Sequence, residues 1–350
     1  MLTKTMRVGA RDIYVATAGE GPPVLFLHGG GPGASGVPNW SRNLEAFAEH
    51  FTVIVPDLPG YGRSSKNLDH EDPFGDLAAA MGDLLEVLEI AKAHLVGNSY
   101  GGAAALRLAL DRPDRVDRMV LNGPGGIGTT RALPTKGLNQ LLDYYGGEGP
   151  TRAKMAAFIS ESLVADPSSV TEEIIDIRYQ NSLDPEVIAN PPLRRPSGKN
   201  ALRTLWRMDL TRDARLARCE VPTLVMWGTE DKVNRPSGGP RLAFTMPHCD
   251  LYLASGVGHW VQPAPISRGE LLQLGAISDD VTNMQTAFAR YGYGIPVTGK
   301  YDGATMEVVT AFQRHFRPAK IDGVCDRSTM ETLHALLASL PAEAMNVAKK

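Results

Sequence analysis

The sequence contains few cysteines and no long apolar run. Its 350 residues include three cysteines, Cys219, Cys249 and Cys325, without a CxxC pair. An odd number of scattered cysteines argues against a disulfide framework and a zinc knuckle, and it fits a reducing compartment. No run of 18 apolar residues occurs, and polar residues interrupt the first 21 residues every few positions, so neither a membrane-spanning helix nor a signal peptide is predicted. We therefore expect a cytoplasmic protein that does not bind membranes.

The sequence also lacks an excess of charge of either sign. It contains 36 Lys and Arg residues against 39 Asp and Glu residues, a formal net charge of −3. Nucleic acids and anionic membranes are bound through strongly basic surfaces, so we expect neither as a partner. None of the eight histidines forms an HxH or HExxH pair, which argues against a metal site, and we predict no cofactor. The expected partners are a small-molecule substrate and further copies of the chain in a homo-oligomer.

Short apolar runs rich in β-branched residues alternate with segments of helical spacing. The runs stop at glycine or proline, as strands of a buried sheet do, and they are DIYVATA, PVLFLHGGG, FTVIVPDLPGYG, AHLVGNSYGG, DRMVLNGPGG and PTLVMWGTED. Alternating strands and helices predict a mostly parallel sheet with helices on both faces. Between about 125 and 205 the strand signals vanish, and helical segments are broken by GGEGP and NPPLRRPSG. This profile indicates a helical cap inserted into an α/β core.

The motif GNSYGG indicates a catalytic serine. It places Ser99 at the centre of Gly-x-Ser-x-Gly between a strand and a helix, where glycines permit the strained turn that lifts a hydroxyl above a sheet. A serine needs a base to become a good nucleophile, and the base needs an orienting group. Asp231, in WGTEDKV, lies at the end of a predicted strand, and His259 follows 28 residues later (259 minus 231). We predict these three as a catalytic triad, with His259 half-exposed between Gly258 and Trp260.

Backbone amides near the serine are the predicted oxyanion hole. The glycines of LHGGGPG let the backbone approach a substrate, and the candidate donors are the amides of Gly30 and Tyr100. Glu230 and Asp57 compete with the favoured acid of the triad. We interpret Asp57, in PDLPGYG, as a carboxylate that stabilises a turn, and His28 as a residue that shapes the oxyanion loop.

Several of these stretches together resemble one family, the meta-cleavage product hydrolases, which are carbon–carbon bond hydrolases of the α/β-hydrolase superfamily that act in bacterial degradation of aromatic compounds. The stretches are LHGGGPGASG, DLPGYGRSS, HLVGNSYGGAAALRLALDRPDRV, LNGPGG, WGTEDKVN and GHWVQ, and the similarity covers roughly residues 1 to 262. The resemblance implies a substrate of the 2-hydroxy-6-oxohexa-2,4-dienoate type, formed by ring cleavage of a catechol. Water splits it into a 2-hydroxypentadienoate and a second acid.

The resemblance also implies four substrate-binding residues. Asn98 matches the family's polar residue beside the nucleophile, and Asn39 matches one in the loop above it. Arg178, in TEEIIDIRYQNS, matches the cap arginine that holds the carboxylate or oxo end of the substrate, a role suited to a planar fork of donors. Trp260 matches the aromatic residue next to the base. Without the resemblance, Arg178 would be interpreted as a solvated helix-face residue and Trp260 as a core residue.

The sequence departs from the family's pattern in the cap and in the loop after the glycines. Leu163 stands where several members carry an aromatic residue, and VPNW replaces the usual aromatic-containing run after GGPGASG. The substrate side of the pocket is therefore open to other chemistry. Carboxylic ester hydrolysis is the nearest alternative activity, because the same triad and oxyanion hole serve both reactions.

The C-terminal segment resembles a different family. MQTAFARYGY, TGKYDGATMEVVTAFQ and IDGVCDRSTMETL are similar to the peptidoglycan-binding module of three short helices that is appended to cell-wall amidases. The zinc-binding catalytic part of an amidase has no counterpart in the chain. The resemblance makes peptidoglycan a candidate partner, and a second hypothesis is a peptidoglycan-binding protein whose hydrolase part is impaired.

These observations predict four parts. Residues 1–124 and 206–262 form the α/β-hydrolase core, 125–205 the helical cap, 263–274 a linker and 275–340 the peptidoglycan-binding-like module. After GHWVQ the hydrolase family continues with a helix that packs on the core, whereas this chain continues with PAPISRGELLQLG. We therefore expect apolar core surface to be left open and the histidine loop to be more mobile than in a complete family member.

Overall fold

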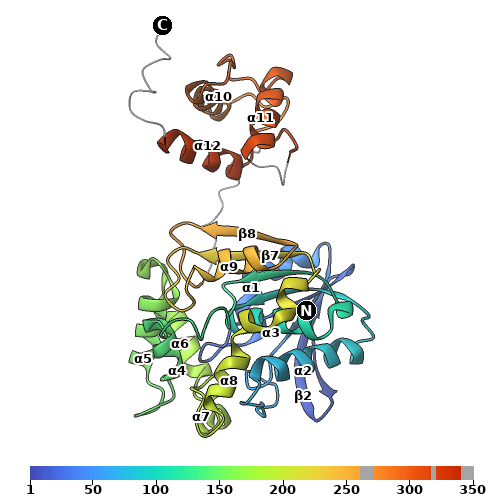
Figure 1. The fold of residues 1–350 in the computed structure, drawn as a ribbon, viewed down its shortest axis with the longest axis vertical. Coiled ribbons are helices and arrows are strands. Elements are labelled where there is room, and N and C mark those ends of the chain that lie inside the picture. Colours follow the sequence, from blue (N-terminus) through green and yellow to red (C-terminus); the bar gives the residue numbers. More distant parts are fainter. Residues whose placement is uncertain (261–271, 317–320, 340–350) are drawn as a thin grey trace. The chain divides into compact units, whose positions relative to one another are not determined.

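The structure, a computed structural model, describes residues 1–260, 272–316 and 321–339 and forms two compact units (Figure 1). The units are Met1–Gln262 and Pro263–Lys350. Most of the predicted linker lies outside the described residues, but Leu272 at its end is buried in the apolar core of the second unit. That core therefore begins before the predicted module boundary. Among the described residues, no helix is long and apolar enough to cross a membrane.

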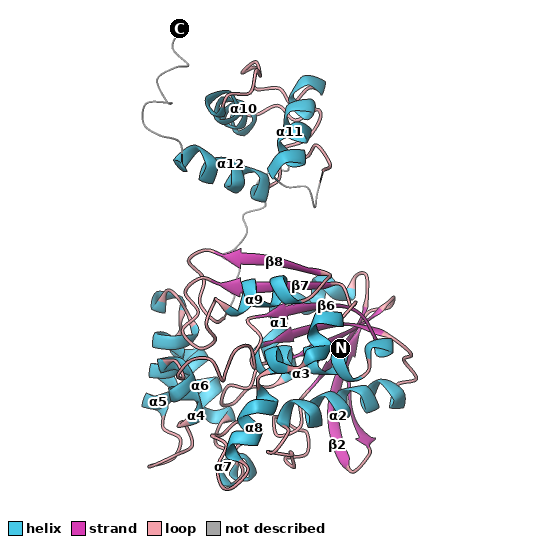
Figure 2. Cartoon of the chain, viewed as in Figure 1, coloured by secondary structure: helices cyan, strands magenta, loops and turns pink. Residues whose placement is uncertain are grey.

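The first unit is built on an eight-stranded sheet in the order β1-β2-β4-β3-β5-β6-β7-β8 (Figure 2). Neighbours from β4 through β8 run parallel, whereas β1 pairs antiparallel with β2, and β2 with β4. The predicted mostly parallel sheet is therefore confirmed. The strands are β1 (Leu2–Val8), β2 (Arg11–Ala18), β3 (Pro23–Leu27), β4 (Thr52–Pro56), β5 (Ala93–Asn98), β6 (Val116–Asn122), β7 (Thr223–Gly228) and β8 (Cys249–Ala254).

The two outer strands were not recognised from the sequence. β1 is exposed along most of its length, and β8 is largely exposed or half-buried. Neither strand carries the continuous apolar run of a strand that is buried on both faces. Their pairing partners, rather than their own composition, hold them in the sheet.

Helices cover both faces of the sheet. The side chains of α2 (Pro73–Val87), α3 (Ser99–Asp111) and α9 (Gly238–Thr245) join the main core on one face. On the other face, α1 (Gly36–Ala48) packs its Trp40 and Leu44 against β3 and β4. The sheet is thus the middle layer of three.

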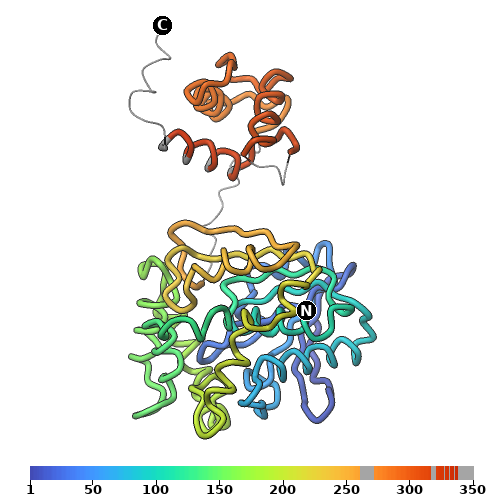
Figure 3. Tube along the Cα trace, viewed as in Figure 1, coloured from blue at the N-terminus to red at the C-terminus, as the bar shows by residue number. Residues whose placement is uncertain are grey.

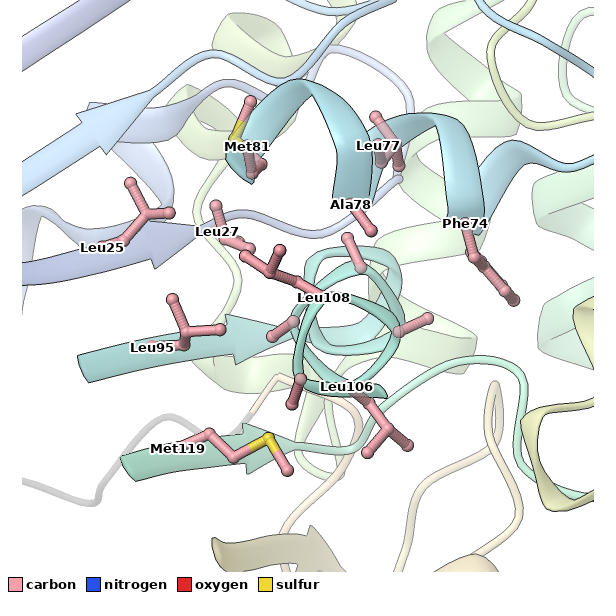
Figure 4. Close-up of a cluster of buried hydrophobic side chains, with 14 of the residues drawn as sticks. Leu25, Leu27, Phe74, Leu77, Ala78, Met81, Leu95, Leu106, Leu108 and Met119 are labelled. Carbon is pink, nitrogen blue, oxygen red and sulfur yellow. The ribbon is translucent and has the colours of Figure 1, made fainter. Parts of the chain in front are cut away.

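The main core lies between α3 and the central strands. Leu25, Leu95 and Met119 come from three adjacent strands and face Leu108 of α3, and Met81 of α2 packs above them (Figure 4). All of these side chains are at most 2% exposed. Full burial of a side chain of this size contributes about 1.5–3 kcal/mol, so this cluster fixes α3, and with it the turn at its N-terminus.

The segment between β6 and β7 forms the cap, which gathers on one side of the first unit (Figure 3, green to yellow). Three of its helices begin after a threonine whose hydroxyl accepts a backbone N–H, which are Thr135, Thr151 and Thr171. The cap contains no strand, as expected from the sequence, and its residues are all described. The elements are α4 (Lys136–Leu142), α5 (Arg152–Phe158), a π-helical turn (Ile159–Leu163), α6 (Glu172–Asn181), α7 (Pro185–Ala189) and α8 (Ala201–Met208).

One part of the sheet is open. Val225 and Trp227 of β7 are buried in the main core, so Leu224, which alternates with them, points to the face that carries α1. Tyr252 pairs in register with Met226 and points to the same face. Leu224 is 37% exposed and Tyr252 is 45% exposed. Among the described residues, this part of the sheet exposes apolar side chains, and the predicted loss of a covering helix stays a prediction.

The second unit is a three-helix module with two matching turns. Gln285 and Gln313 are fully buried, and each side-chain amide binds a turn that follows its own helix. Each amide oxygen accepts the N–H of a glycine with positive φ, Gly299 or Gly323. The two buried amides stabilise the turns between the helices. The helices are α10 (Asp279–Tyr291), α11 (Gly303–Phe316) and α12 (Arg327–Ser339).

Adjacent positions of β7 test the open face. We expect Leu224→Thr to lower the free energy of unfolding by about 1 kcal/mol or less, because its side chain is already in contact with water. The matched variant Val225→Thr buries a hydroxyl on the covered face and should cost about 2–3 kcal/mol. Urea denaturation of the full chain measures both. Equal losses would mean that the Leu224 face is covered in solution.

Candidate active site

Ser99 lies at a strained turn between β5 and α3. Its φ is +51°, an unusual value for a residue with a side chain. The flanking glycines make the turn sterically accessible, because a Cβ on Gly97 would lie 2.6 Å from the Gly101 carbonyl oxygen, and a Cβ on Gly101 would lie 2.3 Å from the Leu27 carbonyl oxygen. The main core holds α3 in place. The packing of α3 therefore fixes Ser99 at the carboxyl end of the sheet. This close packing is possible only because residues 97 and 101 are glycines.

Asp231 and His259 form a buried hydrogen-bonded pair. The His259 Nδ1 lies 2.7 Å from the Asp231 Oδ2. The other carboxylate oxygen, Oδ1, accepts the backbone N–H groups of Val233 and Asn234, each at 2.8 Å. These bonds fix the orientation of the carboxylate. Because the carboxylate binds the Nδ1 of His259, the Nε2 on the other side of the ring points away from Asp231. His259 is 4% exposed, so the expectation of a half-exposed base was wrong.

The cap, not a terminal helix, holds the histidine loop. The Trp260 N–H donates to the Leu163 carbonyl oxygen of the π-helical turn at 2.7 Å. A Cβ on Gly258 would lie 2.7 Å from the backbone of Val164 and Ala165, so only glycine allows this approach. The loop around His259 is therefore anchored although the residues after it, 261–271, lie outside the described part of the chain.

The two predicted oxyanion donors lie next to each other. A Cβ on Gly30 would lie 2.8 Å from the Cβ of Tyr100, so the glycine loop passes directly over the start of α3. Tyr100 is the second residue of that helix, and its N–H therefore has no acceptor within the helix. The Tyr61 hydroxyl donates to the Gly30 carbonyl oxygen at 3.0 Å and orients this peptide.

His28 and Asp57 stabilise the glycine loop through hydrogen bonds. His28 is fully buried, and its Nδ1 lies 2.8 Å from the Gly29 carbonyl oxygen while its Nε2 accepts the Leu58 N–H at 2.9 Å. Burial lowers the pKa of His28, consistent with a neutral ring that donates on one side and accepts on the other. Asp57 accepts the N–H groups of Gly36 and Arg63 at 2.7 and 2.9 Å. Its role as a turn-stabilising carboxylate is confirmed, and it does not contact His259.

Most of the predicted site residues meet in one small cavity of about 20 Å³. Asp231 stays outside it, behind His259, and Tyr100 faces a second cavity. Apolar side chains complete the walls of the small cavity, and sequence analysis did not single out three of them, Leu141, Phe158 and Val233. The cavity is lined by Gly29, Gly30, Gly31, Asn39, Asn98, Ser99, Leu141, Phe158, Leu163, Arg178, Val233, His259 and Trp260.

Arg178 brings an unneutralised cation to this cavity. No carboxylate of the described residues lies within 4.0 Å of its guanidinium, and its buried Nε has no hydrogen-bond partner. Its Cζ lies 5.4 Å from the ring centre of Trp260, and a Cβ on Gly31 would lie 2.8 Å from one of its terminal nitrogens. Burial lowers the pKa of Arg178 to about 10. Since a buried charge without a partner is costly, the site is suited to an anion.

A second, larger cavity opens on the other side of Ser99. It has a volume of about 450 Å³ and shares Ser99, Leu141 and Val233 with the small cavity. We call it the acyl chamber, because a group attached to a carbonyl carbon at the Ser99 hydroxyl would enter it. Near Ser99 its walls are mostly apolar, with Phe74 and Ile127 among them. Ser99 thus lies between a small cavity that contains Arg178 and the larger acyl chamber.

The comparisons with known proteins agree with this geometry. The family of the alpha/beta hydrolase fold matches residues 22–263. A 2-hydroxy-6-oxo-6-phenylhexa-2,4-dienoate hydrolase of Burkholderia cepacia is 35% identical over 71% of this chain and 85% of its own length. A 2-hydroxy-6-oxononadienedioate/2-hydroxy-6-oxononatrienedioate hydrolase of Comamonas testosteroni is 34% identical over the same shares of both chains. The chain belongs to the meta-cleavage product hydrolase family of the α/β-hydrolases.

Solved structures of this hydrolase family superpose on the first unit. A meta-cleavage product hydrolase from Pseudomonas fluorescens IP01 gives a TM-score of 0.65 at 30% identity, covering 74% of this chain and 92% of that one. A 2-hydroxy-6-oxo-6-phenylhexa-2,4-dienoate hydrolase from Rhodococcus sp. strain RHA1 gives 0.62 at 27% identity, covering 75% and 92%. The remaining part of the chain has its own match, since a peptidoglycan binding domain covers residues 278–333. The hydrolase fold and the appended module are both confirmed.

Sequence analysis of this hydrolase missed two residues that support the site. The Trp227 indole N–H donates to the Asp231 Oδ2 at 3.1 Å, so the carboxylate oxygen that faces His259 also accepts a second bond. Its position directly before GTED was a usable signal, because a buried indole N–H seeks an acceptor. The contact of Tyr61 with the Gly30 peptide had no such signal, since it joins segments 31 residues apart.

Among the described residues, no cluster of His, Cys, Asp and Glu could hold a metal ion.

Proposed function

We propose that the chain hydrolyses the C–C bond of a 2-hydroxy-6-oxohexa-2,4-dienoate-type ring-fission product. The observation that carries the proposal is the cation of Arg178, without a carboxylate partner among the described residues, on the wall of the cavity that also contains Ser99 and His259. The dienoate end of such a substrate supplies an anion for this arginine, and the rest of the molecule enters the acyl chamber. A neutral ester offers nothing to Arg178.

The proposed residues account for the reaction in order. His259, oriented by Asp231, delivers a proton to a carbon of the dienolate and forms a ketone. Ser99 then gives its proton to His259 and adds to the carbonyl carbon in the acyl chamber, while the amides of Gly30 and Tyr100 stabilise the oxyanion. The C–C bond breaks as its electron pair moves into the conjugated oxo acid, and the resulting dienolate takes the proton from His259 and leaves as the 2-hydroxypentadienoate. Water, deprotonated by His259, finally hydrolyses the acyl-serine to the second acid.

Asn39 and Asn98 support the binding role of the small cavity. The Asn39 Oδ1 accepts the Gly29 N–H, and the Asn98 Oδ1 accepts a proton of Asn122. These bonds, at 3.4 and 3.3 Å, involve only the Oδ1 atoms, so the Nδ2 group of each amide can donate to oxygen atoms of the dienoate. We propose that these two amides and Arg178 bind the enolate and carboxylate oxygens.

The first prediction concerns the nucleophile. We expect Ser99→Ala to abolish turnover of dienoates and of esters, with a loss on the order of 10⁶ in kcat as in other serine-triad enzymes. Stopped-flow absorbance of the dienoate and circular dichroism of the variant give the measurement and its folding control. Activity of a folded Ser99→Ala within tenfold of the parent would remove Ser99 from the mechanism.

The second prediction separates C–C hydrolysis from ester hydrolysis. Arg178→Met removes a charge-assisted contact worth about 1.5–3 kcal/mol, so kcat/KM for a dienoate should fall about 10- to 150-fold more than kcat/KM for p-nitrophenyl acetate. The melting temperature should not fall, because the arginine has no described carboxylate partner to lose. Arg152→Met, an exposed cap arginine paired with Glu172 and Asp176, is the matched control. Equal losses on both substrates would contradict the role of Arg178.

A second activity is proposed for the C-terminal module. Its match to a peptidoglycan binding domain supports binding of the full chain to peptidoglycan. We expect the protein to sediment with insoluble peptidoglycan, to stay in solution with cellulose as the control polymer, and to turn over the dienoate in both mixtures. Sedimentation without any turnover would favour the alternative of a binding protein with an impaired hydrolase unit. Equal recovery from the supernatant in both mixtures would contradict wall binding.

A further inference from the structure

The acyl chamber carries charge of one sign. Its walls include five arginines and no Asp or Glu, although the whole chain has slightly more acidic than basic residues. An apolar acyl group would need none of these cations. The arginines are Arg131, Arg194, Arg195, Arg235 and Arg241.

Four of these five arginines have no carboxylate partner among the described residues. Arg195 is neutralised by Asp143, with N–O distances of 2.9 and 2.8 Å. In contrast, Arg131, Arg194, Arg235 and Arg241 form no ion pair within 4.0 Å with any carboxylate that the structure describes. Arg194 donates to the side-chain oxygen of Asn190 at 3.1 Å. Arg235 donates to the carbonyl oxygen of Leu133, which orients its guanidinium without cancelling the charge.

Two of the uncompensated arginines flank one point of the chamber wall. Gly128 has a φ of +70°, and a Cβ there would lie 3.8 Å from the Arg241 Nε and 3.9 Å from the Arg131 Cδ. Arg131 lies in the loop between β6 and α4, whereas Arg241 belongs to α9. The fold therefore brings together two arginines that are distant in the sequence. The shared part of the wall next to Ser99 consists of Leu141 and Val233. The chamber wall is therefore apolar where it meets the serine, and it carries two arginine side chains at Gly128, whose N–H donates to the buried carboxylate of Asp209 at 3.1 Å.

We infer that the group on the far side of the scissile bond ends in a carboxylate. This inference rests on the proposed function and narrows its substrate class to dianionic ring-fission products, with one carboxylate at Arg178 and a second near Arg131 and Arg241. An apolar spacer fits the inner wall, and the terminal anion meets the two arginines. Exposed cations also attract a dianion over a distance, which raises the rate of encounter at low salt.

Paired substrates test the inference. For C–C cleavage the pair is 2-hydroxy-6-oxononadienedioate and 2-hydroxy-6-oxo-6-phenylhexa-2,4-dienoate; for esters it is the p-nitrophenyl monoester of adipic acid and p-nitrophenyl hexanoate, which match in chain length. We expect the charged member of each pair to be preferred. The double variant Arg131→Gln/Arg241→Gln should lower the charged-to-neutral ratio of kcat/KM about tenfold, and 0.5 M salt should lower it in the parent. Arg118→Gln, on an exposed arginine of β6 outside the chamber, is the control.

The outcomes separate the inference from the proposed function. Turnover of both dienoates with a ratio that the double variant and salt leave unchanged would overturn the dianionic substrate class and retain C–C hydrolysis. Failure to cleave either dienoate would overturn the proposed function, and the ester pair would then decide the role of the two arginines. A tenfold fall in the adipate-to-hexanoate ratio supports a carboxylate site in the chamber, and an unchanged ratio removes it.

Discussion

The site depends on backbone segments that approach each other more closely than any side chain would permit. A Cβ on Gly101 would lie 2.3 Å from a carbonyl oxygen of β3, one on Gly33 2.1 Å from the Arg178 carbonyl oxygen, and one on Gly228 2.2 Å from the Val257 carbonyl oxygen. Each contact joins a different part of the site: the serine turn to the sheet, the glycine loop to the cap, and the strand before the acid to the histidine loop. The positions of Ser99 and of Arg178 follow from these contacts and from the packing of α3.

Those contacts also explain which parts of the molecule the sequence could predict. The inner strands and the serine turn have strong local signals, because burial on both faces demands continuous apolar runs and the turn demands glycine. β1 and β8 have no such signal, since an edge strand is defined by the neighbour with which it pairs. Within the site, the order of Ser99, Asp231 and His259 was visible in the chain, whereas the burial of His259 depends on a cap segment almost a hundred residues earlier. The resemblance to a family supplied Arg178, and only the structure reveals that it has no carboxylate partner among the described residues.

Electrostatics divides the space around Ser99 into two environments. On one side, the buried guanidinium of Arg178 has no hydrogen-bond partner for its Nε. A buried charge without a partner is unfavourable, so the small cavity favours an anion. On the other side several exposed arginines surround a wider space, where water screens each of them. The first arrangement favours tight, oriented binding of a short charged group, and the second favours selection among groups of different charge at a distance. A substrate that satisfies both aligns its scissile carbon with the serine between them.

The bond between the Trp260 N–H and the Leu163 carbonyl oxygen links the segment that carries His259 to the cap. A movement that lifts the π-helical turn away from the core also releases the segment that carries His259. The position of His259 is therefore coupled to the position of this cap segment, and a substitution that displaces the π-helical turn also displaces the histidine.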